Sequence, residues 1–114
     1  MLHLKTITKD NWFQAVSLRV REDQVNLVAS NAVSLAQLNF LENFHAKGIY
    51  QDDDMIGFTL YGIDEEDHEY WIYRLMIDQK YQGKGYGKES LKLVIEDIRT
   101  TRAITYQTTK ITII

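Results

Sequence analysis

The sequence contains neither cysteine nor proline among its 114 residues. Without cysteine, no disulfide and no thiolate metal site can form, and this composition leads us to expect a cytoplasmic protein. Without proline, the ends of helices and domains have to be inferred from glycine, capping residues and periodicity. We find no linker or repeat, so we predict one domain over residues 1–114, with 100–114 as an atypical tail.

Long apolar runs and an excess of positive charge are also missing. No apolar run approaches the roughly 20 residues needed to cross a bilayer, and the stretch MLHLKTITKDN does not resemble a signal peptide. Lys and Arg number 13 against 16 Asp and Glu, which makes the net charge −3. Nucleic-acid-binding domains usually carry a basic stripe, and here only Lys80, Lys84 and Lys88 form a small basic group. We therefore predict no membrane and no nucleic-acid partner.

Acidic residues are concentrated in two short stretches, 52–54 and 64–67. Such clusters usually lie in solvated turns, and the alternative is an acidic rim whose field attracts a small cation. The histidines His3, His45 and His68 have no partner at the spacing of a metal site, so we predict no metal.

The first third of the chain predicts a strand, a helix and a loop. Residues 2–7 alternate apolar and polar side chains, as in a strand, and residues 10–20 favour a short helix with Asp10 as its N-cap. The periodicity weakens over residues 21–33, which we interpret as a loop or a short helical turn.

A second helix is predicted over residues 34–47. Ser34 and Gln37 form a capping-box pattern at its start, and Gly48 follows its end, where glycine is common.

Three strands and another helix are predicted next. Residues 48–51, 55–63 and 69–78 are rich in aromatic or β-branched side chains, and acidic turns separate them, so we expect an antiparallel meander. A helix over 88–98 and a strand within 110–114 complete the prediction. The apolar positions of that helix have helical spacing and are Leu91, Val94, Ile95 and Ile98.

The turn YQGKGYGKES, residues 81–90, predicts an anion site. It lies between a strand and a helix, where glycines allow close approach and the first helical N–H groups have no partner. A Walker loop is excluded, because Gln82 replaces its first glycine and Glu89 its Ser or Thr. A dinucleotide-binding fingerprint would need glycine at Lys88 and a preceding parallel unit.

The pattern that fits residues 82–87 is Gln-x-x-Gly-x-Gly. It strongly resembles the acetyl-CoA pyrophosphate loop of the GNAT superfamily of N-acetyltransferases, and the order of elements over roughly residues 1–99 matches as well. The stretches VASNAVSLAQ and YWIYRLMIDQKYQGKGYGKESL look closest to the diamine and spermine/spermidine branch. The resemblance implies an α+β fold with a mixed central sheet, made of an antiparallel meander, a splayed strand, the glycine turn and a helix, and incomplete at the C-terminus.

The resemblance also implies acetyl-CoA as co-substrate and a small amine, a diamine or polyamine, as acceptor. The strand before the turn would pair with pantetheine, and the N–H groups of the turn would hold the pyrophosphate. Lys84 and Lys88 would add positive charge, or would only keep the turn solvated. The implied acetyl-CoA residues are Leu75, Met76, Ile77, Gln82, Gly83, Lys84, Gly85, Tyr86, Gly87 and Lys88.

Acetyl transfer of this kind requires a neutral amine. An alkylamine with a pKa near 10.4 is neutral in only about one molecule in a thousand at neutral pH, so a base has to remove its proton. By chain order the candidates are Glu69, which alternatively only begins a strand, and Glu22, which alternatively is only exposed. Glu22 and Asp23 are also candidates for binding a second ammonium group.

The C-terminal tail departs from the family. Family members continue beyond the glycine-turn helix and usually carry a late tyrosine that protonates the leaving thiolate, whereas here RTTRAITYQ, with Tyr106, fits poorly. Two hypotheses stay open: an amine acetyltransferase, and a truncated, non-catalytic remnant that binds CoA or self-associates. Since the apolar helix face and a sheet edge would lack cover, we predict a homodimer formed through residues 100–114.

Overall fold

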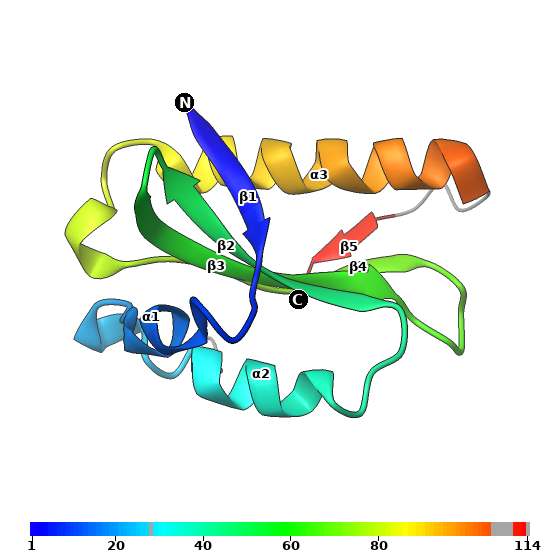
Figure 1. Ribbon diagram of the computed structural model, residues 1–114, viewed down its shortest axis with the longest axis horizontal. Helices are drawn as coiled ribbons and strands as arrows, with labels where there is room; N and C mark the ends of the chain where they lie inside the picture. The colour runs from blue at the N-terminus through cyan, green and yellow to red at the C-terminus, as the bar shows by residue number, and fades with distance from the viewer. Residues whose placement is uncertain (28, 106–110, 114) are drawn as a thin grey trace.

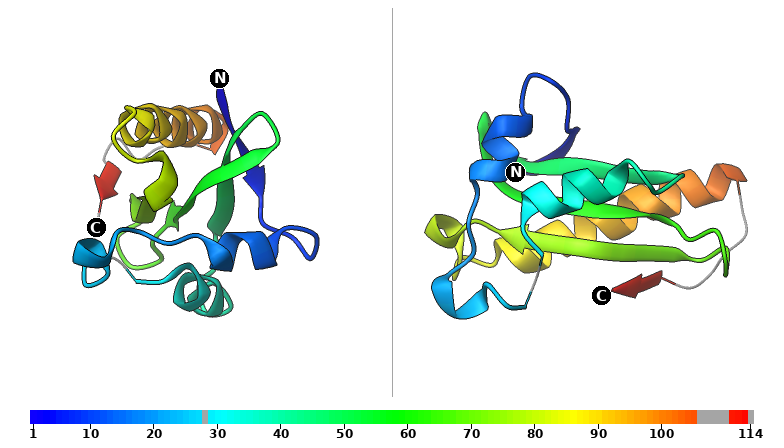
Figure 2. Two further views of the ribbon diagram at one scale, coloured as in Figure 1. Left: turned by 90° about the vertical axis from the view of Figure 1, so that its left-hand side faces the viewer. Right: turned by 90° about the horizontal axis from the view of Figure 1, so that it is seen from below.

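The computed structural model describes residues 1–27, 29–105 and 111–113, and a five-stranded sheet lies at its centre. The strands, in their order across the sheet, are β1 (Leu2–Thr6), β2 (Phe44–Gln51), β3 (Asp54–Ile63), β4 (Tyr70–Ile77) and β5 (Ile111–Ile113). The helices are α1 (Trp12–Ser17), α2 (Asn31–Leu38) and α3 (Tyr86–Thr105), with short 3-10 turns η1 (Glu22–Gln24) and η2 (Gln79–Tyr81). Helix α3 covers one face of the sheet, and α1 and α2 cover the other (Figure 1, Figure 2).

Most predicted elements are confirmed. The strands predicted at 2–7, 55–63 and 69–78 end within one residue of the observed strands, and the last strand lies within 110–114. Strands β1 to β4 pair in antiparallel fashion and β5 is parallel to β4, so the mixed sheet is confirmed. Helix α3 continues to Thr105, well past its predicted end at residue 98.

The second helix was predicted in the wrong place. Its N-cap is Ser30, whose Oγ accepts a hydrogen bond from the backbone N–H of Val33 at 3.1 Å. Ser34 is instead buried inside α2, and its hydroxyl donates to the Ser30 carbonyl. Residues 44–47 belong to β2, where they pair with β3, and Gly48 lies within that strand rather than after a helix.

The cap of the first helix was also predicted wrongly. Helix α1 follows Asn11, not Asp10, and no side chain caps it. The Asn11 side chain closes the turn after β1: its Oδ1 accepts from the Thr8 N–H at 2.7 Å, and its Nδ2 donates to the Thr6 carbonyl at 3.2 Å.

A bulge divides β4 into two parts. Leu60 pairs with Arg74 and Tyr61 with Ile72, so Tyr73 is the extra residue. Among the described residues, β5 pairs with β4 along Tyr70–Ile72. In the described part of the chain, no strand therefore lies beside the outer edge of β4 from Tyr73 to Ile77, which matches the splayed strand that the resemblance implied.

Both faces of the sheet are packed. The α1 and α2 face buries Ala15, Phe44, Ala46, Tyr50, Met55, Phe58, Leu60 and Met76. The α3 face buries Leu2, Ile49, Ile56, Tyr61, Tyr70, Ile72, Ile77, Val94 and Ile98. Three large aromatic residues, Trp12, Phe13 and Phe40, are not in the core but are exposed to 49%, 69% and 87%. Trp12 and Phe13 belong to α1, and Phe40 follows the end of α2.

The apolar face of α3 has cover within this chain. Val94 and Ile98 are fully buried against the sheet, and Leu91 packs beside them. This part of the argument for a dimer was therefore wrong. Tyr106 lies outside the described residues, and none of the described helices is long and apolar enough to cross a membrane.

Candidate functional site: a cleft at the glycine loop

The loop between β4 and α3 is anchored by hydrogen bonds at its first residues. Asp78 is buried, and its carboxylate accepts hydrogen bonds from the backbone N–H groups of Arg19, at 2.8 Å, and Lys80, at 3.2 Å. The N–H of Gln79 donates to the Arg19 carbonyl at 2.7 Å. These bonds attach the loop to the end of α1 and so fix where the glycines begin.

The glycines that follow adopt conformations that other residues avoid. Gly83 and Gly85 have φ angles of +79° and +83°, and a Cβ atom at either would project into open space. Among the described residues, no acceptor receives a hydrogen bond from the N–H groups of 83–88, and the first local bond of the helix is Glu89 N–H to Gly85 O. Exposed, unpaired N–H groups at a helix N-terminus form an anion site, which fits a pyrophosphate.

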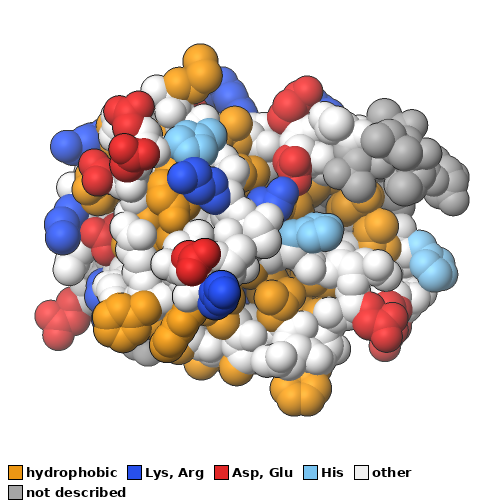
Figure 3. Space-filling view, viewed as in Figure 1, with side chains coloured by type: hydrophobic (Ala, Val, Ile, Leu, Met, Phe, Trp, Pro, Cys, Tyr) orange, Lys and Arg blue, Asp and Glu red, His pale blue; other side chains and the backbone are white. Residues whose placement is uncertain are grey.

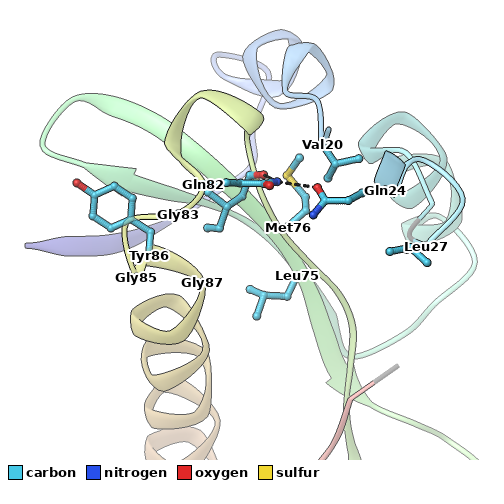
Figure 4. Close-up of a pocket in the computed structure, with 11 residues that line it drawn as sticks. Val20, Gln24, Leu27, Leu75, Met76, Gln82, Gly83, Gly85, Tyr86 and Gly87 are labelled. Carbon is cyan, nitrogen blue, oxygen red and sulfur yellow. Dashed lines mark hydrogen bonds between the residues drawn. The ribbon is translucent and has the colours of Figure 1, made fainter. Parts of the chain in front are cut away.

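A cleft of about 320 Å³ opens beside these N–H groups (Figure 4). It runs from the loop along the end of β4 and is walled on the far side by the segment around η1. Its lining residues are Val20, Gln24, Leu27, Leu75, Met76, Ile77, Gln82, Gly83, Gly85, Tyr86 and Gly87.

Most predicted acetyl-CoA residues therefore meet in one place. Leu75–Ile77, Gln82, Gly83 and Gly85–Gly87 all line the cleft, whereas Lys84 and Lys88 are exposed beside it. The mostly apolar strand end suits pantetheine, and the loop suits its phosphates, so the residues present fit CoA.

Three residues of the cleft were missed by the sequence analysis: Val20, Gln24 and Leu27. Gln24 and Leu27 come from residues 21–33, which we interpreted as a loop or a short helical turn, and Val20 comes from the end of the helix predicted over 10–20. Nothing in their local pattern signals a ligand, because they reach the cleft only through the folding of α1 and α2 over the sheet.

Gln24 and Gln82 join the two walls of the cleft directly (Figure 4). The Nε2 of Gln82 donates to Gln24 Oε1 at 2.9 Å and to the Ile77 carbonyl at 2.8 Å. Both N–H bonds of the Gln82 side chain are thereby used inside the protein. Any anion in the cleft is left to the backbone N–H groups and the nearby lysines.

A side cavity of about 340 Å³ adjoins the cleft on the α1 and α2 side of β4. Val20 and Met76 line both spaces. The side cavity is mainly apolar, and no Asp or Glu is among its lining residues: Val16, Leu18, Arg19, Val20, Val25, Ala29, Ser30, Asn31, Ala32 and Met76.

The structure does not bring the two candidate bases together. Glu22 is exposed in η1, two residues before Gln24. Glu69 lies at the opposite end of β4 from the glycine loop, roughly 25 Å from Ile77 along an extended strand. Neither is among the residues that line the cleft or the side cavity, and their catalytic roles stay predictions.

The acidic turn at 64–67 has a structural function. Asp64 accepts hydrogen bonds from the Glu66 N–H at 2.7 Å and the Tyr73 hydroxyl at 3.3 Å, and Asp67 accepts from the Trp71 indole at 3.1 Å. On the face shown in Figure 3, acidic and basic side chains of the described residues are interspersed, without a continuous basic stripe. The described residues contain no group of three or more acidic or histidine side chains that could hold a metal ion.

Comparisons with known proteins agree with this geometry. The model of a family described as "Acetyltransferase (GNAT) family" matches residues 8–111. A spermine/spermidine N(1)-acetyltransferase of Bacillus subtilis is 31% identical over 103 residues, covering 85% of this chain and 68% of the relative.

Solved structures share the fold at low identity. A protein titled transcriptional regulator from Bacillus halodurans matches with a TM-score of 0.69 at 10% identity, over 100% of this chain and 81% of the other. A PaiA N-acetyltransferase from Thermoplasma acidophilum, solved in complex with coenzyme A, matches with a TM-score of 0.57 at 16% identity, over 91% and 75%.

Proposed function

The chain belongs to the GNAT family of acetyltransferases and is an acetyl-CoA-dependent N-acetyltransferase, and we propose that its acceptor is a diamine or polyamine. The observation that carries the proposal is the pair of adjoining spaces at Met76, one suited to CoA and one mainly apolar. The relative from Bacillus subtilis, named for spermine and spermidine, supports this choice of acceptor.

For the co-substrate, we propose that the free N–H groups of 83–88 hold the pyrophosphate and that the outer edge of Leu75–Ile77 pairs with pantetheine. Lys84 and Lys88 add positive charge at the exposed rim. When bound, acetyl-CoA supplies an activated thioester carbonyl. Met76 and Val20, which line both spaces, exclude water at the boundary between them.

For the acceptor, we propose that the side cavity receives the methylene segment of the amine. Its lining contains no carboxylate, so it favours a neutral, reactive amine over an ammonium ion. The exposed carboxylates of Glu22 and Asp23 belong to the adjacent η1 turn and are suited to the distal ammonium group. Asp23 pairs with Arg21 at 3.2 Å, but both side chains are more than half exposed, so a polyamine can displace this pair at little cost.

We also propose that Glu22 or Glu69 accepts the proton of the attacking amine, directly or through water. Glu22 is closer in the chain to the cleft, whereas Glu69 is placed at the far end of β4. The pH profile of kcat in Glu22→Gln and Glu69→Gln distinguishes the two candidates. Substitution of the residue that acts as the base should abolish the fall of kcat at acidic pH.

The acceptor class is tested by acetyl transfer to putrescine, spermidine and butylamine, which has the same kind of primary amine but no second charge. We expect spermidine to have the highest kcat/KM and its advantage over butylamine to shrink as salt rises, because salt screens exposed carboxylates beyond about 10 Å at 0.1 M. The variant Glu22→Gln/Asp23→Asn should lose that advantage, and Asp10→Asn, at an exposed carboxylate in the turn before α1, serves as its control. Equal use of butylamine contradicts the proposal. CoA binding without turnover of any amine favours the non-catalytic alternative.

A homodimer remains part of the proposal, although it no longer rests on the face of α3. Its support is the exposure of three aromatic side chains, Trp12, Phe13 and Phe40. Light scattering should report twice the chain mass of 13.4 kDa. A stable monomer at micromolar concentration contradicts it.

A further inference from the structure

One hydrogen-bonded pair connects the wall of the cleft to the loop that we assign to CoA. Gln24 in η1 and Gln82 in the glycine loop are 58 residues apart in the chain and 2.9 Å apart at Oε1 and Nε2. We propose that Gln24 is a positioning residue that couples binding of the CoA moiety to the shape of the side cavity. The identity of the two ligands rests on the proposed function, whereas the coupling rests on this contact.

The hydrogen-bond network fixes the orientation of both carboxamides. Gln82 Nε2 donates to Gln24 Oε1 and to the Ile77 carbonyl. Gln24 Oε1 accepts a second hydrogen bond, from the backbone N–H of Arg21 at 3.1 Å. Turning over either carboxamide would place a donor against a donor or an acceptor against an acceptor, so only one arrangement satisfies all the bonds.

The segment that Gln24 anchors has few other attachments. The remaining hydrogen bonds of described residues 21–27 are local ones within the segment, such as Leu27 N–H to the Gln24 carbonyl at 2.9 Å. Val25 and Leu27 are 52% and 76% exposed, so burial contributes little to holding the segment in place. A weakly held segment moves at low cost, and a single long-range bond then has a large influence on its position.

The same segment lines both spaces. Gln24 and Leu27 line the cleft, Val25 lines the side cavity, and Val20, directly before the segment, lines both. A ligand that immobilises the loop around Gln82 therefore also immobilises Gln24 and the wall of the side cavity. CoA should therefore raise the affinity of the side cavity for an amine. By thermodynamic reciprocity, an amine bound there raises the affinity for CoA by the same factor.

The first test uses CoA as the only ligand and follows amide hydrogen exchange. In the unchanged protein, CoA should slow exchange both in residues 82–87 and in residues 20–27. In Gln24→Met, which keeps the length but loses the acceptor oxygen, protection of 82–87 should persist while that of 20–27 falls by about fivefold, the worth of one hydrogen bond. Gln24→Glu keeps an acceptor and should restore the protection, and Gln14→Ala, an exposed glutamine on α1, should leave it unchanged.

Equal protection of 20–27 in Gln24→Met and in the unchanged protein overturns the coupling, as does an absence of protection there in the unchanged protein. If Gln24→Met does not fold, Gln24→Ala tests the coupling by the same measurement of protection in residues 20–27.

The second test measures spermidine binding by calorimetry with and without saturating CoA. CoA should raise spermidine affinity about fivefold in the unchanged protein and leave it unchanged in Gln24→Met. An equal rise in both proteins overturns the coupling. Failure of spermidine to bind either protein contradicts the proposed acceptor, and the exchange experiment, which needs no amine, then decides on Gln24 independently.

Discussion

The start and the middle of α3 use their polar groups in opposite ways. At the N-terminal end, the N–H groups of 83–88 have no acceptor in the described chain and face an open cleft. Further along the helix, Asp97 accepts a hydrogen bond from the Tyr61 hydroxyl and pairs with Lys47 at 3.2 Å, beside the buried side chains of Val94 and Ile98. One helix is thus anchored where its polar groups are satisfied, and we propose that it binds acetyl-CoA where they are not.

This difference has an energetic basis. The Tyr61 side chain is almost completely buried, and burial together with the hydrogen bond to Asp97 raises the pKa of its phenol far above the usual 10.0. The phenol therefore stays protonated and remains a donor to Asp97. At the N-terminal end of α3, the exposed N–H groups are hydrated in the free protein, and an anion can replace that water at modest cost.

The largest effect that would sharpen the comparison is expected at the binding end. Gly85→Asp should weaken acetyl-CoA binding by about a thousandfold, because a side chain at φ +83° is strained and its carboxylate repels phosphate. Calorimetry gives the affinity, and circular dichroism should show an intact fold. Lys84→Ala, in the same loop but outside the cleft lining, should cost less than about tenfold. Unchanged affinity in a folded Gly85→Asp protein would disprove the loop assignment.

The next largest effect is expected in the anchored middle of α3. Ile98→Ala should lower the free energy of unfolding by about 3 kcal/mol, because it leaves a cavity under a side chain that is 1% exposed. Acetyl-CoA affinity of the folded protein should change little. Ile95→Ala, at a half-buried position of the same helix, should cost clearly less in urea unfolding. If the two variants lose equal stability, the packing of α3 is not as described.

A smaller loss of stability is expected when the hydrogen bond between Tyr61 and Asp97 is removed. Asp97→Ala should cost about 2 kcal/mol in unfolding free energy, since it leaves the buried Tyr61 hydroxyl without its acceptor. Glu96→Ala, exposed on the neighbouring position, is the matched control and should be nearly neutral. If Asp97→Ala instead lowers CoA affinity as strongly as stability, the start and the middle of α3 do not act separately.

The smallest effect concerns pH. Partial burial, and then the charge of Lys47, hold the pKa of His45 below its usual 6.5, while Asp97 partly opposes this. The unfolded chain therefore binds a proton at higher pH than the folded one, so stability is lost as pH falls below 6.5. Between pH 7.5 and 5, the unchanged protein should lose slightly more stability than His45→Gln in urea unfolding. A steeper loss of stability in His45→Gln would mean that the pKa of His45 is raised, not lowered, in the folded protein.

Sequence reasoning could predict the loop and strand of the candidate site because they are contiguous. Leu75–Ile77 and the glycines of 82–87 lie within one strand–turn–helix unit, and the helix N-terminus dictates what such a unit can hold. It missed Gln24, which lies 58 residues from its partner Gln82. A contact over that distance depends on how α1, η1 and α2 pack on the sheet, and no local pattern encodes it.

The misplaced helix has the same origin. The local pattern of residues 34–47 favours a helix, but 44–47 gain a full ladder of hydrogen bonds by pairing with β3, and Phe44 gains burial in the core. Periodicity, turn chemistry and the order of elements are local properties, so the sequence by itself determined the meander, the glycine turn and the α3 helix. The far wall of the cleft, the side cavity and the exposure of Trp12, Phe13 and Phe40 depend on long-range packing, so only the tertiary structure decided them.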